Sequence, residues 1–287
     1  MSDPRADSVR ARLLNRARER GEDFNLLLTQ YALERWLYRL SVSGEQAGFV
    51  LKGALLFSLW FDVPHRPTRD ADFLGYGKVD VAVLRARVQT VCGIPCDDGM
   101  RFDADSVTVQ PIREEALYDG LRASVVGWLG TARCKVQLDV GYGDAVTPAA
   151  EVQVYPTLLP GFPAPQLRVY PRETVIAEKF EAIVSLGMRN SRMKDYFDVW
   201  VLLRRDGYDG TLLAQAIRAT CERRGTPLPA VWPVGLTAEF AGDVAKMAQW
   251  QAFLRKNKLD ASALTDVVTD LRVALAGPLE RARGPTP

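Results

Sequence analysis

Two aspartates separated by one residue, Asp70 and Asp72, are the side chains of this sequence whose type and spacing most directly suggest chemistry. They alternate with Ala71 and Phe73, so on an extended strand both carboxylates project from one side. Two adjacent anions repel unless a cation joins them, and Mg²⁺ takes one or two protein carboxylates and completes its coordination with water and phosphate oxygens. The pair therefore predicts a Mg²⁺ site, although Asp-x-Asp also occurs in ordinary surface turns.

A third carboxylate, Asp139, lies in a segment that alternates apolar and polar residues as a strand does. The apolar positions are Val136, Leu138 and Val140, so Asp139 faces away from the core side. On a strand next to the first pair, this carboxylate would allow two metal ions to be held together, which is the arrangement that supports in-line phosphoryl displacement. The alternative is that Asp139 begins the glycine-containing turn that follows it.

Several residues near the aspartate pair suit phosphate. Lys52-Gly53-Ala54 opens a helix whose backbone N–H groups would attract phosphate, although the GxxxxGK[ST] pattern of a P-loop is absent from the sequence. Arg66 and Arg69 flank the carboxylates, where they would neutralise a triphosphate or simply form ion pairs. Thr68 places a hydroxyl at the mouth of the predicted site, and its phosphorylation would set negative charge against the carboxylates.

A lysine and an aspartate in the second half of the chain complete the predicted site. A helix over 173–186 would place Lys179 in an apolar stripe, with Glu178 and Glu181 on the opposite side. A buried ammonium needs a partner, so Lys179 either extends its amine to solvent at a domain seam or reaches nucleotide phosphates as a compact charge. Asp198 either orders Lys179 or a nearby arginine, or caps an exposed edge.

Two expectations follow for this part of the chain. Neither Asp70 nor Lys179 is expected to be a packing residue, so alanine at either position should abolish activity with little loss of fold. Basic residues also concentrate here, which suits either a nucleic-acid backbone or an ordinary solvated helix face. They are Arg189, Arg192, Lys194, Arg204 and Arg205.

The elements that must position these residues are mixed in the first half and helical in the second. The pattern predicts one long helix from Ser8 to Leu40, a helix over 79–91, and a sheet of four or five strands, hence an α/β or α+β domain. Prolines then crowd 156–171, which we interpret as a domain boundary. We expect three parts: an N-terminal helical segment over 1–47, a core over 48–160, and a helical domain over 161–287.

Composition excludes several classes of protein. The chain has 287 residues with 47% hydrophobic content, enough for a large core, and its net charge of +2 restricts any nucleic-acid contact to a local patch. A single histidine, His65, disfavours histidine-based zinc sites and catalytic triads, and four scattered cysteines suggest reduced thiols. The N-terminus lacks a signal-peptide pattern and no segment is apolar enough to span a membrane, so we expect a cytoplasmic protein.

Taken together, four motifs resemble those of the AbiEii/MenT group of nucleotidyltransferase-like toxins. They are Lys52-Gly53-Ala54-Leu55-Leu56, the RxTxDxD element at 66–72, Ile176-Ala177-Glu178-Lys179 and Lys194-Asp195-Tyr196-Phe197-Asp198. The resemblance covers roughly residues 20–275 and implies an α+β fold, with a DNA-polymerase-β-like nucleotidyltransferase core joined to a C-terminal helical bundle. One departure is that this group commonly has Gly-Ser where this chain has Gly53-Ala54. The missing hydroxyl removes one potential phosphate contact.

The resemblance also implies a function. Members of this group are toxins of bacterial toxin–antitoxin pairs that transfer a nucleotide from an NTP to the 3′ acceptor end of tRNA and so block aminoacylation and translation. By motif, Asp70 and Asp72 would bind Mg²⁺, and Lys179 and Asp198 would be the essential residues of the helical domain. We expect Asp139 either to complete one site of a two-metal centre or to ease deprotonation of the acceptor hydroxyl. The residues expected to contact the nucleotide are Lys52, Gly53, Arg66, Thr68 and Lys179. The expected partners are tRNA and a cognate antitoxin.

Two other functions remain compatible with the sequence. The same chemistry could modify a protein hydroxyl or a small molecule in place of RNA. A non-catalytic module that sequesters a partner is the alternative from another class of protein, and it would not need the aspartate pair.

Overall fold

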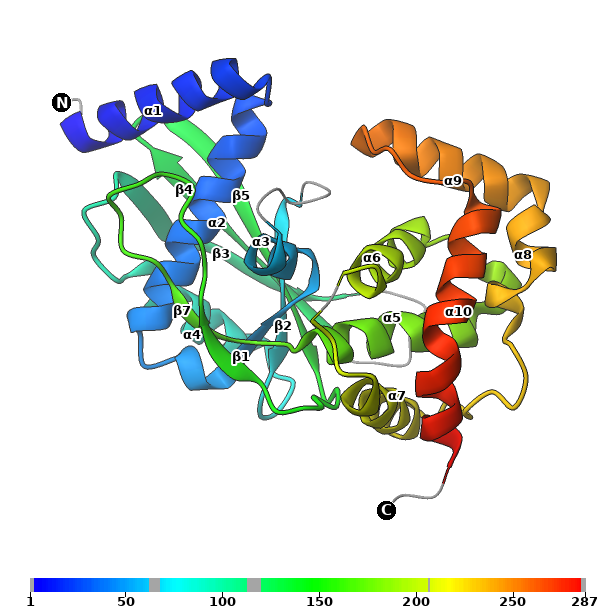
Figure 1. Cartoon of the computed structure of the whole chain (residues 1–287). Helices are drawn as coiled ribbons and strands as arrows, with labels where there is room; N and C mark the ends of the chain where they lie inside the picture. Colours follow the sequence, from blue (N-terminus) through cyan, green and yellow to red (C-terminus); the bar gives the residue numbers. More distant parts are fainter. Residues whose placement is uncertain (1–2, 62–67, 113–119, 206, 285–287) are drawn as a thin grey trace. The chain divides into compact units, whose positions relative to one another are not determined.

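The computed structural model describes residues 3–61, 68–112, 120–205 and 207–284. The chain forms two compact units, each with its own core. The first comprises Met1–Gly143 and Glu151–Val169, and the second comprises Asp144–Ala150 and Tyr170–Pro287. We describe each unit by itself. The first combines a mixed sheet with helices and the second is helical (Figure 1), which confirms the α+β class.

The first unit is built on a mixed sheet, which has seven strands in the part of the chain that the structure describes. The strands are β1 (Phe49–Lys52), β2 (Asp70–Gly75), β3 (Met100–Pro111), β4 (Gly120–Leu129), β5 (Ala132–Tyr142), β6 (Glu151–Val154) and β7 (Gln166–Val169). Their order is β3-β4-β5-β2-β1-β7-β6, and the β2–β5 and β1–β7 pairs are parallel. The site strands β2 and β5 therefore lie side by side near the middle of the sheet.

Two of these strands were missed by the sequence pattern. β6 and β7 lie within or beside the proline-rich stretch, and β6 forms one edge of the sheet. Pro156, Pro160, Pro163 and Pro165 fall in the connection between the two strands, where no ladder hydrogen bond is lost. The proline-rich segment up to Val169 thus belongs to the sheet unit. The helical unit comprises Tyr170–Pro287 together with Asp144–Ala150, whereas the sequence pattern put the boundary after residue 160.

In the described residues of this unit, four α-helices accompany the sheet: α1 (Pro4–Arg20), α2 (Phe24–Val42), α3 (Phe57–Trp60) and α4 (Val81–Cys92). The single long helix expected from the sequence is two helices. Gly21 ends α1 in the left-handed conformation at φ 63°, and the Asp23 side chain accepts a hydrogen bond from the Leu26 N–H to begin α2. α2 packs against β5 and β7 and carries much of the core, including the fully buried Trp36.

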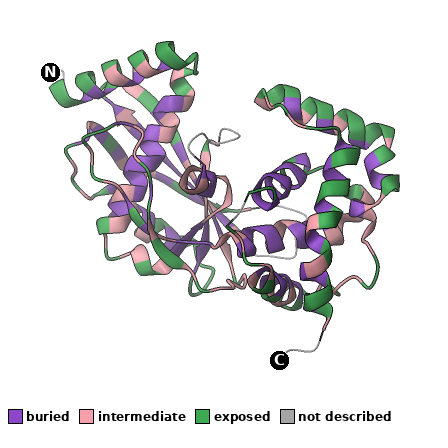
Figure 2. Cartoon of the chain, viewed as in Figure 1, coloured by how far each residue is buried: buried purple, intermediate pink, exposed green. Residues whose placement is uncertain are grey.

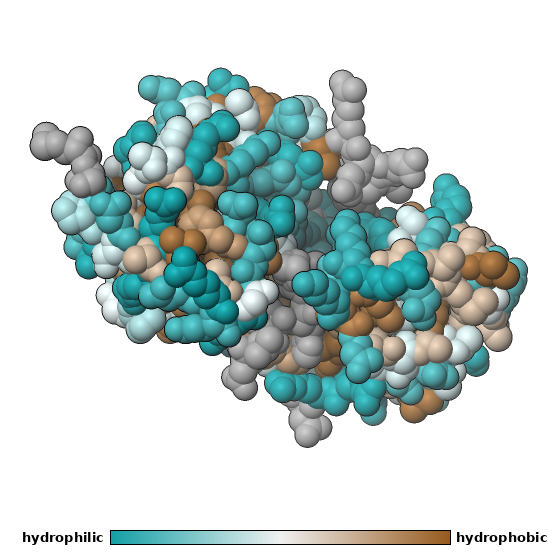
Figure 3. Space-filling view, turned by 90° about the horizontal axis from the view of Figure 1, so that it is seen from above, coloured by the Kyte–Doolittle hydropathy of each residue, from teal (hydrophilic) through white to brown (hydrophobic). Residues whose placement is uncertain are grey.

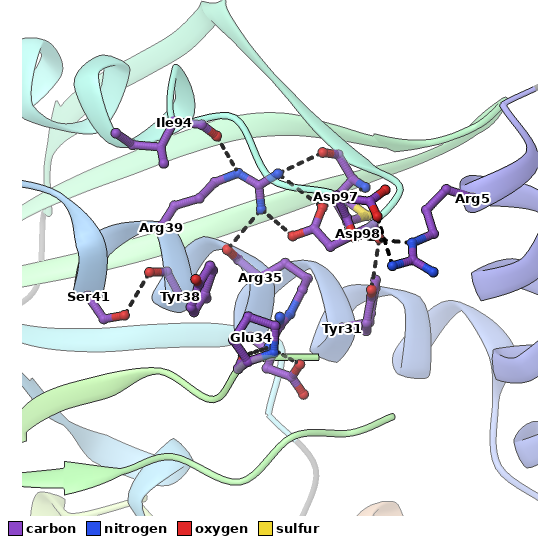
Figure 4. Close-up of polar contacts among 12 residues, drawn as sticks. Arg5, Tyr31, Glu34, Arg35, Tyr38, Arg39, Ser41, Ile94, Asp97 and Asp98 are labelled. Carbon is purple, nitrogen blue, oxygen red and sulfur yellow. Dashed lines mark hydrogen bonds and ion pairs between the residues drawn. The ribbon is translucent and has the colours of Figure 1, made fainter. Parts of the chain in front are cut away.

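Polar side chains of α2 are buried together with its apolar face, which the sequence pattern did not predict. Figure 4 shows the Arg39 guanidinium donating to both carboxylate oxygens of Asp98, at 2.6 and 3.0 Å. The same guanidinium donates to the carbonyls of Ile94 and Met100, and the Tyr31 hydroxyl donates to the Asp98 carbonyl at 2.8 Å. These bonds fix the loop between α4 and β3 on the helix, so the polar groups are satisfied inside the unit.

The second unit contains α5 (Arg172–Leu186), α6 (Met193–Leu203), α7 (Gly210–Arg224), α8 (Ala238–Gly242), α9 (Val244–Asn257) and α10 (Leu264–Arg283). The helix expected over 238–255 is divided by Asp243, whose side chain accepts a hydrogen bond from the Lys246 N–H and so begins α9. α6 is buried along almost its whole length (Figure 2), and it packs against α5, α9 and α10.

Hydrophilic side chains cover most of the surface seen in Figure 3, with apolar side chains in smaller patches. Within the described part of the chain, no helix combines the length and apolar character needed to cross a membrane. The four cysteines are free thiols, of which Cys92, Cys134 and Cys221 are buried.

Candidate active site

Four adjacent strands of the first unit each contribute one charged residue to a line across the sheet. Cα pairing places Lys52 opposite Asp72, Asp72 opposite Asp139, and Asp139 opposite Arg122. Residues paired in this way share one face of a sheet. We call this line the polar row: Lys52, Asp72, Asp139 and Arg122. Two anions therefore stand side by side between two cations.

The opposite face of the same strands is the core, which explains why the acidic side chains share a face. Ala71 and Phe73 of β2 are 0% and 1% exposed, and Leu138 of β5 is 1% exposed, whereas Asp70, Asp72 and Asp139 are half-buried. A shift of either strand by one residue would exchange these faces. The hydrophobic pattern thus fixes the register that aligns the carboxylates.

Asp70 lies two residues before Asp72 on β2, so its side chain is on the same face as the polar row. Its Cα is paired with that of Gln137 on β5. The Thr68 hydroxyl donates a hydrogen bond of 2.6 Å to Asp70 Oδ1. Such a bond orients the carboxylate and leaves Oδ2 as its second acceptor. The Thr68 hydroxyl, expected to contact a nucleotide, is therefore engaged with the acidic pair.

Gly53 supports Asp72 by having no side chain. A Cβ added at Gly53 would lie 1.9 Å from Asp72 Oδ2, and the residue has φ +75°. Both the left-handed backbone and the closeness of the carboxylate require glycine here. The helix expected after it is a 3₁₀ turn at Gly53–Leu56 followed by the single turn of α3.

We expect Gly53→Ala to impair the site more than it impairs the fold. The left-handed backbone costs about 1–2 kcal/mol for a non-glycine residue, and displacing Asp72 by about 1 Å costs about 100-fold in rate. Denaturant unfolding and nucleotidyl transfer would be measured together. Gly21→Ala is the matched control, because Gly21 has φ +63° and nothing within 4 Å of an added Cβ. Equal losses of activity in the two variants would contradict the assigned role of Gly53.

Asp139 is paired with an arginine that the sequence gave no reason to single out. Arg122 Nε donates to Asp139 Oδ1 at 2.8 Å, and Arg122 Nη2 donates to Oδ2 at 2.7 Å. This is the bidentate geometry of a guanidinium and a carboxylate. The Asp139 side chain is 14% exposed and that of Arg122 is 35% exposed. Both carboxylate oxygens of Asp139 are thus occupied by one cation.

The residues present fit a divalent cation at Asp70 and Asp72, but not the expected cluster of three carboxylates. The two aspartates supply hard oxygen donors from one strand face, which suits Mg²⁺ with phosphate and water as further ligands. Among the residues that the structure describes, no group of three or more His, Cys, Asp or Glu side chains could hold a metal ion. Because Arg122 pairs with Asp139, the candidate metal site among the described residues is the acidic pair Asp70 and Asp72.

Lys179 of α5 is enclosed by two carboxylates of α6. Its Nζ lies 2.7 Å from Asp195 Oδ1 and 2.9 Å from Asp198 Oδ2. Both aspartate side chains are 0% exposed, and Arg192 Nε lies 2.8 Å from Asp195 Oδ2. Burial alone would raise the pKa of Asp195, but Lys179 and Arg192 together lower it below its usual value. Asp198 forms an ion pair with Lys179, which was one of the alternatives left open by the sequence. Asp195 is a second partner, which the sequence pattern did not identify.

The other side of α5 is also fixed by charge. Glu178 and Glu181, expected on the side opposite Lys179, form ion pairs with Arg224 of α7. Arg224 lies 2.8 Å from a Glu181 oxygen and 3.0 Å from a carboxylate oxygen of Asp144. The helix that carries Lys179 is therefore held between two buried ionic clusters within its own unit.

The remaining predicted residues have varied surroundings. Arg66 and His65 lie outside the described residues. The basic residues around α6 are all exposed, but Arg192 is paired with Asp195 and Arg204 stacks over the Trp200 ring at 4.5 Å. Arg189 and Lys194 are exposed cations at the start of this group.

Two crystal structures from Helicobacter pylori resemble this chain. JHP933 is 16% identical with a TM-score of 0.50, over 90% of this chain and 93% of that chain. A candidate nucleotidyltransferase is 18% identical with a TM-score of 0.49, over 89% of this chain and 95% of that chain. At this level of identity the likeness concerns the fold. No curated protein matches the chain by sequence.

A mixed sheet that presents an acidic pair on a central strand, beside Lys52 of the neighbouring strand, is the arrangement expected of a nucleotidyltransferase core, and a family match shows that the chain is a nucleotidyltransferase. The model of one family, the nucleotidyl transferase AbiEii toxin of type IV toxin–antitoxin systems, matches residues 35–275. The chain belongs to this family, which confirms the resemblance seen in the motifs. Membership implies an antitoxin as partner, and enzymes of this kind use an NTP and a divalent metal ion.

Proposed function

We propose that this chain is a toxin that transfers a nucleoside monophosphate from an NTP to the 3′ acceptor end of tRNA in the cytoplasm. The modified tRNA could not be aminoacylated, so translation would stop. The observation that carries the proposal is the alignment of Asp72 with Lys52 on the strand face that also bears Asp70. An acidic pair beside a cation supports the proposal, because the phosphates of a nucleotide bind both a metal ion and a positive side chain.

In the proposed reaction the acceptor hydroxyl oxygen attacks the α-phosphorus. The bond from that phosphorus to the oxygen bridging to the β-phosphate breaks, and pyrophosphate leaves with the bonding electrons while the hydroxyl proton passes to solvent or a base. Asp70 and Asp72 would hold Mg²⁺, which when bound neutralises charge on the phosphates. The Thr68 hydroxyl orients Asp70 by its hydrogen bond, and the missing side chain of Gly53 leaves room for the Asp72 carboxylate.

The cations have separate proposed tasks. Lys52, the neighbour of Asp72 in the polar row, would contact the triphosphate together with Arg66. Lys179 would steady the triphosphate and the departing pyrophosphate, and Asp198, 2.9 Å away, would hold its ammonium. The exposed Arg189 and Lys194 support contact with an RNA backbone, because such contacts depend on accessible positive charge.

The test is incorporation of label from each α-³²P NTP in the presence of total tRNA and Mg²⁺. We expect label in tRNA with at least one NTP, none from the same NTP labelled at the γ-phosphate, and loss of labelling in EDTA. Label in protein or in a small molecule, with none in tRNA, would show that the acceptor is one of these alternatives and not tRNA. No label from any NTP with any acceptor would favour the non-catalytic binding toxin.

A further inference from the structure

The third carboxylate of the site has a partner that changes its role. Asp139 was expected to complete a metal site, yet both of its oxygens accept hydrogen bonds from Arg122 at 2.8 and 2.7 Å. Freeing this carboxylate for a metal ion would break two charge-assisted bonds and leave the guanidinium without its partner. The strand pairing itself brings the two residues together, because Asp139 on β5 is directly opposite Arg122 on β4.

We propose that Arg122 binds a phosphate of the nucleoside triphosphate and that Asp139 is the positioning residue that holds the guanidinium for it. The inference rests on the proposed nucleotidyl transfer at Asp70 and Asp72. It assigns to Asp139 an action through Arg122 in place of direct metal binding.

Charge supports this assignment. Within the polar row the positive charges of Lys52 and Arg122 flank the negative charges of Asp72 and Asp139. Arg122 offsets the charge of Asp139, and among the described residues of this row and its neighbours Asp70 and Asp72 supply two further carboxylates. Mg²⁺ needs no third carboxylate. An anionic triphosphate approaching this face then meets cations at both ends of the row.

Geometry and burial support it as well. Arg122 lies two strands from Asp72, about 10 Å at the usual strand spacing, on the same face of the sheet. Its side chain is 35% exposed while that of Asp139 is 14% exposed, so the carboxylate lies deeper and the guanidinium is accessible to a ligand. A planar guanidinium fixed by a bidentate carboxylate loses little further freedom when it binds phosphate.

The experiment compares wild type with Arg122→Ala, Arg122→Lys, Asp139→Ala, the double variant R122A/D139A and Arg133→Ala. Arg133 is an exposed arginine of β5, six residues from Asp139 on the same face, and serves as the matched control. Each protein is checked for folding by thermal unfolding. The measurements are the Kd of each NTP in EDTA, the kcat and KM for the NTP, and the Mg²⁺ concentration that gives half the maximal rate.

We expect Arg122→Ala to raise the Kd in EDTA and the KM about 10- to 100-fold, because a charge-assisted contact is lost. Arg122→Lys should fall between it and wild type, since the charge remains without the planar fork. Asp139→Ala should weaken binding about 3- to 10-fold, and R122A/D139A should match Arg122→Ala within about twofold, because the aspartate acts through the arginine. The half-saturating Mg²⁺ concentration should stay constant, and Arg133→Ala should behave as wild type.

Two outcomes would overturn the inference. If Asp139→Ala alone raises the Mg²⁺ requirement, Asp139 is a metal ligand. If folded Arg122 variants bind every NTP as wild type does, the pair only joins β4 to β5. A wild-type protein that binds NTPs but labels no acceptor would refute the proposed function while leaving the Kd comparison in EDTA to decide the role of Arg122.

Discussion

Asp72→Asn and Asp70→Asn should each lower nucleotidyl transfer by about 1,000-fold or more. Each change removes one negative charge from the acidic pair, and the charge stabilisation that such ligands support is several kcal/mol, at about 1.4 kcal/mol for each tenfold in rate. Fold should be kept, because asparagine has the shape of aspartate and fits beside Gly53 in the one case and accepts from Thr68 in the other. Initial rates of label transfer would be measured with thermal unfolding of the same samples.

A binding measurement separates this role from a general loss of activity. Calorimetric titration with Mn²⁺ should show weaker binding in both variants, whatever the acceptor used in the assay. Asp105→Asn is the matched control, because Asp105 is an exposed carboxylate of β3, a strand that does not adjoin β2 or β5. Variants that keep their transfer rate within tenfold of wild type would remove the acidic pair from the reaction.

The local part of this site could be predicted from the sequence because strand periodicity is local. Alternation of Ala71 with the two aspartates of β2, and of Leu138 with Asp139, correctly gave the solvent-facing side of each strand. The bidentate bond from Arg122 could not be foreseen. It depends on the register of β4 against β5, which places two residues seventeen positions apart opposite each other.

For the helical residues, too, the sequence pattern predicted which side chains need partners but did not identify all of those partners. The apolar stripe of α5 predicted that Lys179 needs a partner, and Asp198 was the residue proposed. Asp195 was missed although it precedes Asp198 by three residues, a spacing that places both carboxylates on one helix face. Glu178 and Glu181 were placed on the side of the helix opposite Lys179, but helical period gives a direction and not the neighbour that lies there. That neighbour is Arg224 of α7.

The pairing of Lys179 changes what its replacement should do to the fold. The sequence suggested that this lysine could be removed with little structural loss. In the structure its ammonium contacts two carboxylates that are 0% exposed, and Arg192 is the second cation at Asp195, so removal of Lys179 leaves an excess of buried negative charge. Breaking a buried ion pair from one side costs about 3–5 kcal/mol. Replacement of Lys179 is therefore expected to change both stability and activity, and a loss of activity alone would not distinguish a structural role from a role in the reaction.

Lys179→Met should abolish label transfer and lower the free energy of unfolding by about 3–5 kcal/mol at pH 8. Methionine keeps the apolar stem and removes only the charge. In wild type the lowered pKa of Asp195 contributes stability that is present above about pH 4 and lost as the pH falls. Without Lys179, Arg192 still lowers that pKa but the larger lowering contribution is lost, so the variant gains less stability than wild type as the pH rises through about 4. The stability difference should thus grow from about pH 3 to about pH 6.

A second substitution separates the two roles of Lys179. Adding Asp195→Asn to Lys179→Met removes one of the buried charges and should restore much of the stability at pH 8, while label transfer stays lost because the ammonium is still missing. Lys256→Ala, at an exposed lysine of α9, controls for the loss of a positive charge. Recovery of transfer together with stability in the double variant would show that Lys179 serves the fold of the helical unit and takes no part in the reaction.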